Sequence, residues 1–166
     1  APPLSTEGYP IAELRGGFDA TEGRFALLVS RFHSDVTDRL LEGARACLLE
    51  HGADDTHIEV VRVAGAWELP QLAAHGVRLG RHEAIIALGC VIRGETPHFE
   101  YVCSAASNGL GAVAREAAMP VLFGVLTTDN HAQALARAGQ GKDNKGYECA
   151  MAALEMIQAF RKMEIR

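Results

Sequence analysis

Residues 83–92, EAIIALGCVI, are the stretch that decides the fold of this chain. The run is almost continuously apolar and does not alternate between apolar and polar side chains. That pattern is typical of a strand buried on both faces of a parallel sheet. Three other short runs share it: FALLVS (25–30), IEVVRVA (58–64) and VLFGVLT (121–127). Together they predict four strands of one parallel sheet.

Longer segments of helical periodicity separate these strands and have recognisable ends. The first expected helix runs from a Ser34 cap to Gly52, and the second from Glu68 to Leu79, with Pro70 in its first turn and Gly80 at its end. The third runs from Thr96 to Ala117, with Pro97 at the first helical position. The last two run from a Thr128 or Asp129 cap to Gly139 and from Lys145 to Lys162. Repeated strand–helix units imply right-handed crossovers and a three-layer α/β/α sandwich. Residues 1–23, rich in Pro, Gly and polar side chains, are expected to form an N-terminal arm, and residues 24–166 a single domain.

Composition excludes several classes of protein. Hydrophobic residues make up 48% and charged residues 22% of the 166 residues, as in ordinary globular domains. The formal charge of −5, with no block of Lys or Arg, argues against nucleic-acid binding. No apolar run approaches the length of a membrane helix, and APPLSTEGYP at the start does not resemble a signal peptide. The four cysteines contain no CxxC pair, so we expect a reducing, cytoplasmic location.

Polar and aromatic side chains follow each predicted strand, where ligands bind in open α/β sheets. These segments are Arg31-Phe32-His33, Gly65-Ala66-Trp67-Glu68, Arg93-Gly94-Glu95-Thr96-Pro97-His98 and Thr127-Thr128-Asp129. Because the carboxyl ends of parallel strands share one edge, we expect these segments to lie together.

Each of these features also has a simpler interpretation. Residues 94–98 predict an anion site at a helix start, or only a Thr-Pro helix start. His98 suits proton transfer, or is a first-turn histidine without a role. Phe32 and Trp67 could stack on a planar ligand or belong to the core. Glu68 could bind a ligand or only complement the helix dipole.

Other motifs can be set aside. Residues 109–114, GLGAVA, have a weak dinucleotide pattern but lie within a predicted helix rather than after a strand. The stretch GQGKDNKG (139–146) lacks the first glycine and the Ser or Thr of a P-loop. Neither an HExxH zinc motif nor a GxSxG nucleophile elbow occurs.

Taken together, the motifs resemble the lumazine synthase family. They are RF (31–32), GAWELP (65–70), IRGETPHFEYV (92–102), FGVLTTDN (123–130), ARAG (136–139) and NKG (144–146), in family order from about Gly23 to Met163. The resemblance implies a flavodoxin-like fold with a four-stranded parallel sheet. It also implies condensation of 5-amino-6-(D-ribitylamino)uracil with 3,4-dihydroxy-2-butanone 4-phosphate to 6,7-dimethyl-8-ribityllumazine, phosphate and water. This is the penultimate step of riboflavin biosynthesis, and it needs neither metal nor cofactor.

The resemblance also implies roles for particular residues. Those matching the family's ribitylaminouracil site are Phe32, which stacks on the pyrimidine, Ala66, Trp67 and Glu68 at the ribityl chain, and Cys90, Val91 and Ile92 along the pocket. Glu95 and Thr96 match the butanone-phosphate loop, and His98 the proton-transfer residue. The matches expected from a neighbouring subunit are Phe123, Lys145 and Arg137, the last at the phosphate.

Some implications concern assembly and alternatives. The family pattern implies a homo-oligomer of pentamers, with twelve pentamers in an icosahedral shell as the larger form, and riboflavin synthase as a candidate partner. His33 stands where Asn is commoner, which puts local geometry in question. The alternatives are a non-catalytic flavin- or lumazine-binding shell protein and the archaeal type of riboflavin synthase.

Overall fold

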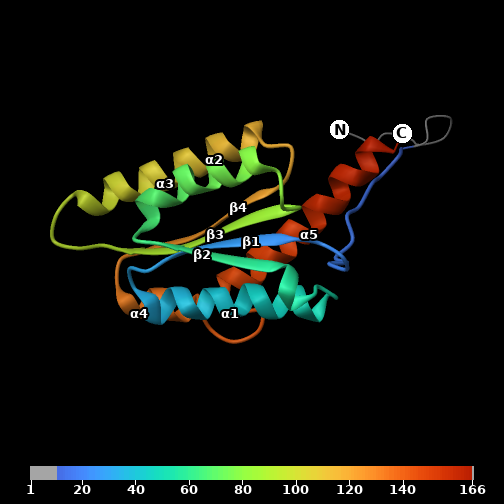
Figure 1. Ribbon diagram of the computed structural model, residues 1–166. Helices are drawn as coiled ribbons and strands as arrows, with labels where there is room; N and C mark the ends of the chain where they lie inside the picture. The colour runs from blue at the N-terminus through green and yellow to red at the C-terminus, as the bar shows by residue number, and fades with distance from the viewer. Residues whose placement is uncertain (1–10, 166) are drawn as a thin grey trace, which may run out of the picture.

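A four-stranded parallel sheet with the order β2-β1-β3-β4 forms the middle layer of the protein (Figure 1). The structure is a computed structural model that describes residues 11–165. The strands are β1 (Phe25–Ser30), β2 (Ile58–Val63), β3 (Ala84–Ile92) and β4 (Val121–Thr128). β1 pairs with both β2 and β3, and β3 pairs in parallel with β4 as well. The prediction of four parallel strands is confirmed.

The strands differ in burial according to their place in the sheet. β1 and the first seven residues of β3 are buried, as expected for central strands with helices on both faces. The prediction that all four strands are buried on both faces is wrong for β2, where Glu59, Val60 and Arg62 are exposed, and for β4, where Phe123 and Thr127 are exposed. β2 and β4 are the edge strands, so fewer neighbours cover their side chains.

Five α-helices complete the three layers. They are α1 (Ser34–Glu50), α2 (Leu69–Leu79), α3 (His98–Glu116), α4 (His131–Ala136) and α5 (Lys145–Glu164). In Figure 1, α2 and α3 cover one face of the sheet, and α1, α4 and α5 cover the other. One apolar cluster fills each interface between sheet and helices, with Leu27, Ile86 and Leu154 in one and Leu28, Ile85 and Leu110 in the other. The predicted α/β/α sandwich is thereby confirmed, and its strand order is flavodoxin-like.

Two predicted helix caps are wrong. Ser34 is the first residue of α1, and the cap is His33, which has a left-handed φ of 61° and whose carbonyl accepts hydrogen bonds from Val36 and Thr37 N–H. The cap of α4 is Asn130, whose Oδ1 accepts from Gln133 N–H at 2.9 Å. In both cases the capping residue lies in the short connection between the end of the preceding strand and the first turn of the helix.

Two predicted helix limits also differ from the structure. α3 begins at His98, and Pro97, with no side-chain cap, precedes it; the predicted start at Thr96 is wrong. Residues 93–97 instead form an irregular loop after β3. α4 ends at Ala136 rather than Gly139, because Ala138 forms an isolated antiparallel bridge with Asn144. This bridge closes the loop between α4 and α5.

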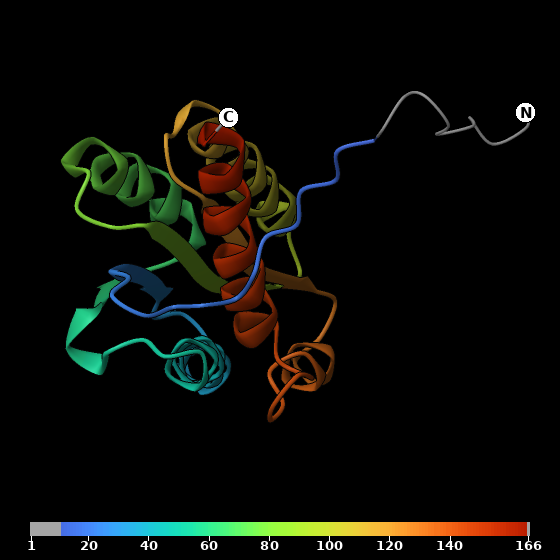
Figure 2. The ribbon, with the colours of Figure 1, turned by 90° about the vertical axis from the view of Figure 1, so that its right-hand side faces the viewer.

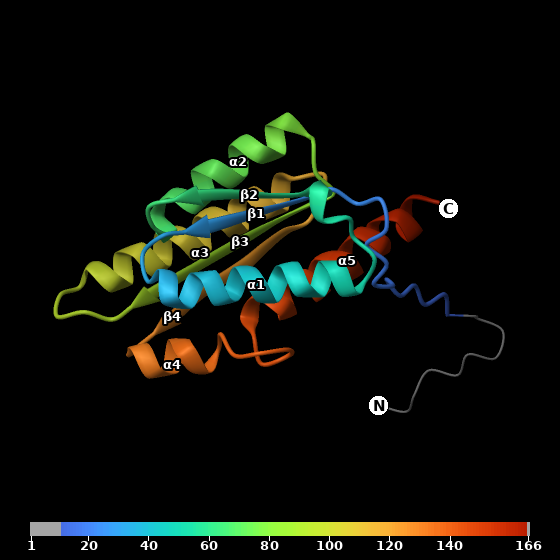
Figure 3. The same ribbon diagram turned by 60° about the horizontal axis from the view of Figure 1, so that its bottom comes forward.

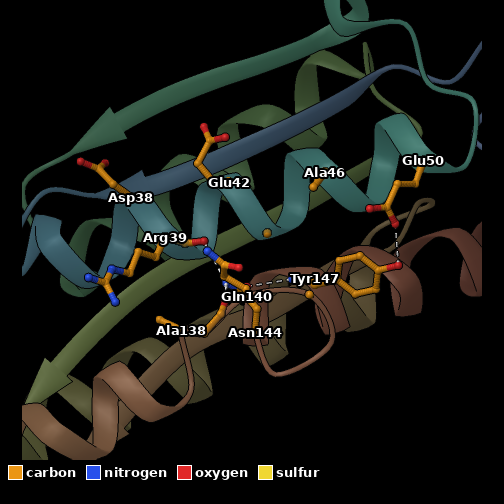
Figure 4. Close-up of a pocket in the computed structure, with 12 residues that line it drawn as sticks. Asp38, Arg39, Glu42, Ala46, Glu50, Ala138, Gln140, Asn144 and Tyr147 are labelled. Atoms are coloured by element: carbon orange, nitrogen blue, oxygen red, sulfur yellow. Dashed lines mark hydrogen bonds between the residues drawn. The ribbon is translucent and has the colours of Figure 1, made fainter.

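The loop between α4 and α5 lies below α1 in Figure 3, and Asn144 holds it against α1 (Figure 4). Its Nδ2 donates to the carbonyls of Arg39 and Gly139, both at 2.9 Å, and its Oδ1 accepts from Tyr147 N–H at 3.1 Å. α1 and α5 approach closely, since a Cβ at Gly146 would lie 1.9 Å from the Leu40 carbonyl oxygen. A cavity of about 680 Å³ opens here, but none of the predicted site residues lines it. Its buried Asn144 already has its hydrogen bonds within the protein.

The segment before β1 runs along α5 without forming a helix or strand of its own (Figure 2). Gly17 N–H donates to Gln158 Oε1 at 3.2 Å, and Gln158 Nε2 donates to the Asp19 carbonyl at 3.3 Å. Residues 1–10 of the predicted arm lie outside the described residues. The division into an arm (1–23) and one domain (24–166) stays a prediction. Of the helices within residues 11–165, none is both long and apolar enough to cross a membrane.

Candidate active site

A cavity of about 360 Å³, which we name the aromatic cleft, opens beyond the carboxyl ends of β1 and β3. The chain leaves these adjacent strands in opposite directions, the topological switch point where ligands bind in such sheets. The lining residues are Phe32, His33, Gly65, Ala66, Trp67, Glu68, Cys90, Val91, Ile92, His98 and Val102. Eight of the predicted site residues therefore come together here.

The aromatic residues of this cleft do not belong to the core. Phe32 is 64% exposed and Trp67 is 63% exposed, which excludes the core interpretation for both within the described chain. The Phe32 N–H donates to the Ala64 carbonyl at 3.0 Å, which fixes the chain after β1. Its ring lies against Gly65, where a Cβ would be 2.8 Å from Phe32 Cδ2, so a larger residue there would displace the ring. The geometry leaves aromatic surface available to a planar ligand.

Glu68 presents an acceptor to the same cleft. It is the last residue of a short 3-10 helix (Ala66–Glu68) that leads directly into α2, and its N–H donates to the Gly65 carbonyl at 3.2 Å. Its Oε2 is buried and has no hydrogen-bond partner among residues 11–165. A buried carboxylate oxygen without a donor is costly, so the helix dipole alone does not account for this side chain. The oxygen suits hydroxyl donors of a ligand.

The end of β3 provides the floor of the cleft. Cys90 is buried, and Val91 and Ile92 are half-buried. Burial, with a smaller contribution from the Asp35 carboxylate, raises the pKa of the Cys90 thiol to about 11. Cys90 therefore remains a thiol at neutral pH and is not a thiolate nucleophile. Its role in the cleft is limited to shape and backbone contacts.

His98 joins the cleft from the first turn of α3, and its side chain is exposed. Val102, one turn later, lines the same cavity. Glu95 and Thr96 are exposed in the preceding loop and are not part of the lining. A Cβ at Gly94 would meet nothing within 4 Å in the described chain, so the space beside this loop is open. The unpaired N–H groups at the start of a helix favour an anion there.

A second cavity of about 620 Å³, the cationic cleft, lies beside β4 and the start of α5. The residues around it are Phe123, Val125, Leu126, Thr127, Ala136, Arg137, Lys142, Asp143, Asn144, Lys145 and Glu148. The Lys145 N–H donates to the Arg137 carbonyl at 2.9 Å, which holds these two cations on adjacent chain segments. Arg137 Nη1 donates to the Gln133 carbonyl at 3.0 Å and makes no ion pair within residues 11–165. Lys145 Nζ lies 3.5 Å from Glu148 Oε1, and Asp143 also lines the cleft, so Arg137 and Lys142 are the cations of this cleft available to a phosphate.

The two clefts share no lining residue in the described chain. Phe123, Arg137 and Lys145 lie in the cationic cleft, apart from the eight predicted residues of the aromatic cleft. Among the lining residues that the sequence did not predict are Val102 in the aromatic cleft and Lys142 in the cationic cleft. Val102 could have been predicted, because a residue four positions after His98 lies on the same face of a helix. No local sequence pattern indicated Lys142. Among residues 11–165, no three His, Cys, Asp or Glu side chains are grouped to hold a metal ion.

Comparison with known proteins agrees with the resemblance. A family model described as 6,7-dimethyl-8-ribityllumazine synthase matches residues 22–161. A protein of that name from Chlorobium phaeobacteroides is 45% identical over 152 residues, covering 92% of this chain and 98% of the relative. Its namesake from Chlorobium luteolum is 41% identical over 153 residues, covering 92% and 99%. The chain belongs to the 6,7-dimethyl-8-ribityllumazine synthase family.

Proposed function

We propose that the protein is a lumazine synthase, which condenses 5-amino-6-(D-ribitylamino)uracil with 3,4-dihydroxy-2-butanone 4-phosphate to 6,7-dimethyl-8-ribityllumazine. One phosphate and two water molecules leave. Family membership supports the reaction, the penultimate step of riboflavin biosynthesis. The observation that carries it is the aromatic cleft, where Phe32, Glu68 and His98 meet from three separate segments.

The aromatic cleft fits the pyrimidine substrate. The exposed Phe32 ring stacks on the uracil, and the unpaired oxygen of Glu68 accepts hydrogen bonds from ribityl hydroxyls. Ala66 and Trp67 border the ribityl chain, and Cys90, Val91 and Ile92 border the ring. These contacts orient the 5-amino group, which is the nucleophile of the reaction. The enzyme therefore needs no nucleophile of its own, in agreement with the protonated Cys90.

The chemistry after binding consists largely of proton transfers. The 5-amino nitrogen attacks the ketone carbon, and loss of water gives a Schiff base. Phosphate then leaves by elimination, and the ribityl-bearing nitrogen closes the ring with loss of the second water. His98 lines the cleft and carries protons between these groups. Holding the two substrates side by side provides a further share of the rate.

The phosphate-bearing substrate needs groups from both clefts. Glu95 and Thr96 form the loop beside its phosphate, and the guanidinium of Arg137 pairs with the phosphate. By the family resemblance, Arg137, Lys145 and Phe123 come from the neighbouring subunit, and their place in a different cleft from His98 supports this. The protein is thus a homo-oligomer with its active sites between subunits. We propose a pentamer, able to form a 60-subunit shell, in the cytoplasm, with riboflavin synthase as a partner.

The test is to mix both substrates with the protein and to follow the fluorescence of the lumazine product. We expect formation well above the spontaneous rate, and no gain would overturn the proposal. The comparisons give no support to the non-catalytic shell protein, which would bind lumazine without turnover. Presenting lumazine alone tests for riboflavin synthase activity; we expect no riboflavin.

A further inference from the structure

Arg93, the first residue after β3, has more side-chain partners than any residue of the loop that it opens. Its Nε donates to Asp129 Oδ1 at 2.9 Å, and its Nη1 lies 3.5 Å from Glu100 Oε1. Its guanidinium carbon lies 4.5 Å from the centre of the Phe99 ring. The Arg93 N–H also donates to the Thr128 carbonyl at 2.9 Å. One side chain thus joins the ends of β3 and β4 to the first turn of α3.

These contacts bracket the loop that precedes α3. Arg93 stands before residues 94–98, and its partners Phe99 and Glu100 stand directly after them. The loop between them is exposed, and Gly94 has no neighbour for a Cβ within 4 Å, so little else in the described chain holds it. Asp129 is itself braced, since its N–H donates to Gln133 Oε1 at 2.8 Å. The guanidinium is therefore the anchor of both ends of the loop.

The partners of Arg93 also argue against a direct contact between its guanidinium and the phosphate. Two carboxylates, those of Asp129 and Glu100, contact this guanidinium, and Glu95 stands two residues further along the chain. Hydrogen bonding to Asp129 raises the pKa of Arg93 and keeps the charge in place. Asp129 and Glu100 engage Nε and Nη1 of the guanidinium, and their two negative charges offset its positive charge, which weakens its attraction for a phosphate. The local charge without Arg93 would repel an anion.

We propose that Arg93 is a positioning residue: held by Asp129, Glu100 and the Phe99 ring, it shapes residues 94–98 for the phosphate-bearing substrate without binding the phosphate. This inference rests on the proposed function for the identity of that substrate. It predicts that loss of Arg93 affects the butanone phosphate and not the ribitylaminouracil, because Arg93 is not among the residues that line the aromatic cleft.

The test compares Arg93→Ala and Arg93→Lys with the unaltered protein. We expect Arg93→Ala to raise the KM for the butanone phosphate at least about tenfold, with the KM for the ribitylaminouracil nearly unchanged, because a misplaced loop costs substrate alignment. Arg93→Lys keeps the charge but cannot bridge both carboxylates in the same plane, so we expect most of the defect to remain. Full activity in Arg93→Lys would overturn the positioning role.

Arg45→Ala is the matched control. Arg45 is a half-buried arginine that also contacts two carboxylates, with hydrogen bonds of 2.9 and 2.8 Å to Asp55 and an ion pair of 3.8 Å to Glu42, but it lines neither cleft. We expect both KM values to stay unchanged and a similar melting temperature for both alanine variants. Equal shifts in both would overturn the inference.

Calorimetric binding of the butanone phosphate separates this inference from the proposed function. If the unaltered protein binds it but forms no lumazine, the proposed function fails, while weaker binding by Arg93→Ala still supports the positioning role. Equal affinity in the unaltered protein and Arg93→Ala overturns the positioning role whatever the turnover.

Discussion

The aromatic and cationic clefts have nearly opposite chemistry. The aromatic cleft has two exposed aromatic rings, an unpaired carboxylate oxygen at Glu68 and an imidazole at His98, and no Lys or Arg among its described lining residues. The cationic cleft has Arg137, Lys142 and Lys145. A reaction between a planar ring substrate and a phosphate-bearing substrate needs both.

The arginines beside the two clefts sharpen the contrast. Arg93, near the aromatic cleft, is occupied by Asp129 and Glu100, whereas Arg137 bonds only a carbonyl through its guanidinium in the described chain. The free guanidinium is thus on the cleft that lacks His98. Under the proposed function, a complete site would join the aromatic cleft of one subunit to the cationic cleft of the next.

The largest expected effect comes from removing the free guanidinium. Arg137→Ala should lose nearly all activity at ordinary concentrations of the butanone phosphate, because its phosphate then lacks a bidentate partner. Steady-state kinetics at increasing butanone phosphate would measure this. Arg115→Ala, an exposed arginine in the last turn of α3, is the control and should retain full activity. Equal activities for the two variants would break the comparison.

His98→Ala should act on the other cleft and mainly on turnover. We expect kcat to fall about a hundredfold, the usual contribution of a positioned acid–base group, with little change in either KM. The fluorescence assay at saturating substrates measures kcat. An unchanged kcat would remove His98 from the chemistry.

Mixed assemblies test whether the two clefts that form one site belong to different chains. Co-expression of His98→Ala and Arg137→Ala should restore about a quarter of the sites. In a random mixture, the chain that provides His98 and the chain that provides Arg137 are each intact at that residue in about half of the cases. Activity of the co-purified mixture, relative to the unaltered protein, measures this fraction. If both halves of a site came from one chain, the mixture would show only the average of the two defective parents.

The smallest expected effect concerns His33, the left-handed cap of α1. His33→Asn should change the free energy of unfolding by less than about 0.5 kcal/mol, because Asn also tolerates positive φ. His33→Val should cost about 1–2 kcal/mol, since a β-branched residue is strained in this conformation. Urea unfolding compares the variants. Equal stability of the two variants would exclude a conformational requirement at this cap.

Much of the site could be predicted before the structure, and the reason is geometric. Residues after parallel strands must lie at one edge of the sheet, so Phe32, Glu68 and His98 were expected together. The structure adds that Phe32 and Trp67 are exposed, which decides between the core and the ligand interpretation. The roles of these residues in catalysis stay predictions.

Local patterns predict the order and type of the elements: apolar runs for strands, helical periodicity between them, and Gly80 or Pro70 near helix ends. The strand order, the left-handed His33, the start of α3 at His98 and the pairing of Arg93 with Asp129 became known only from the folded chain. The same is true of the division of the predicted residues between two clefts. These features depend on contacts between residues far apart in the chain, which no local pattern records.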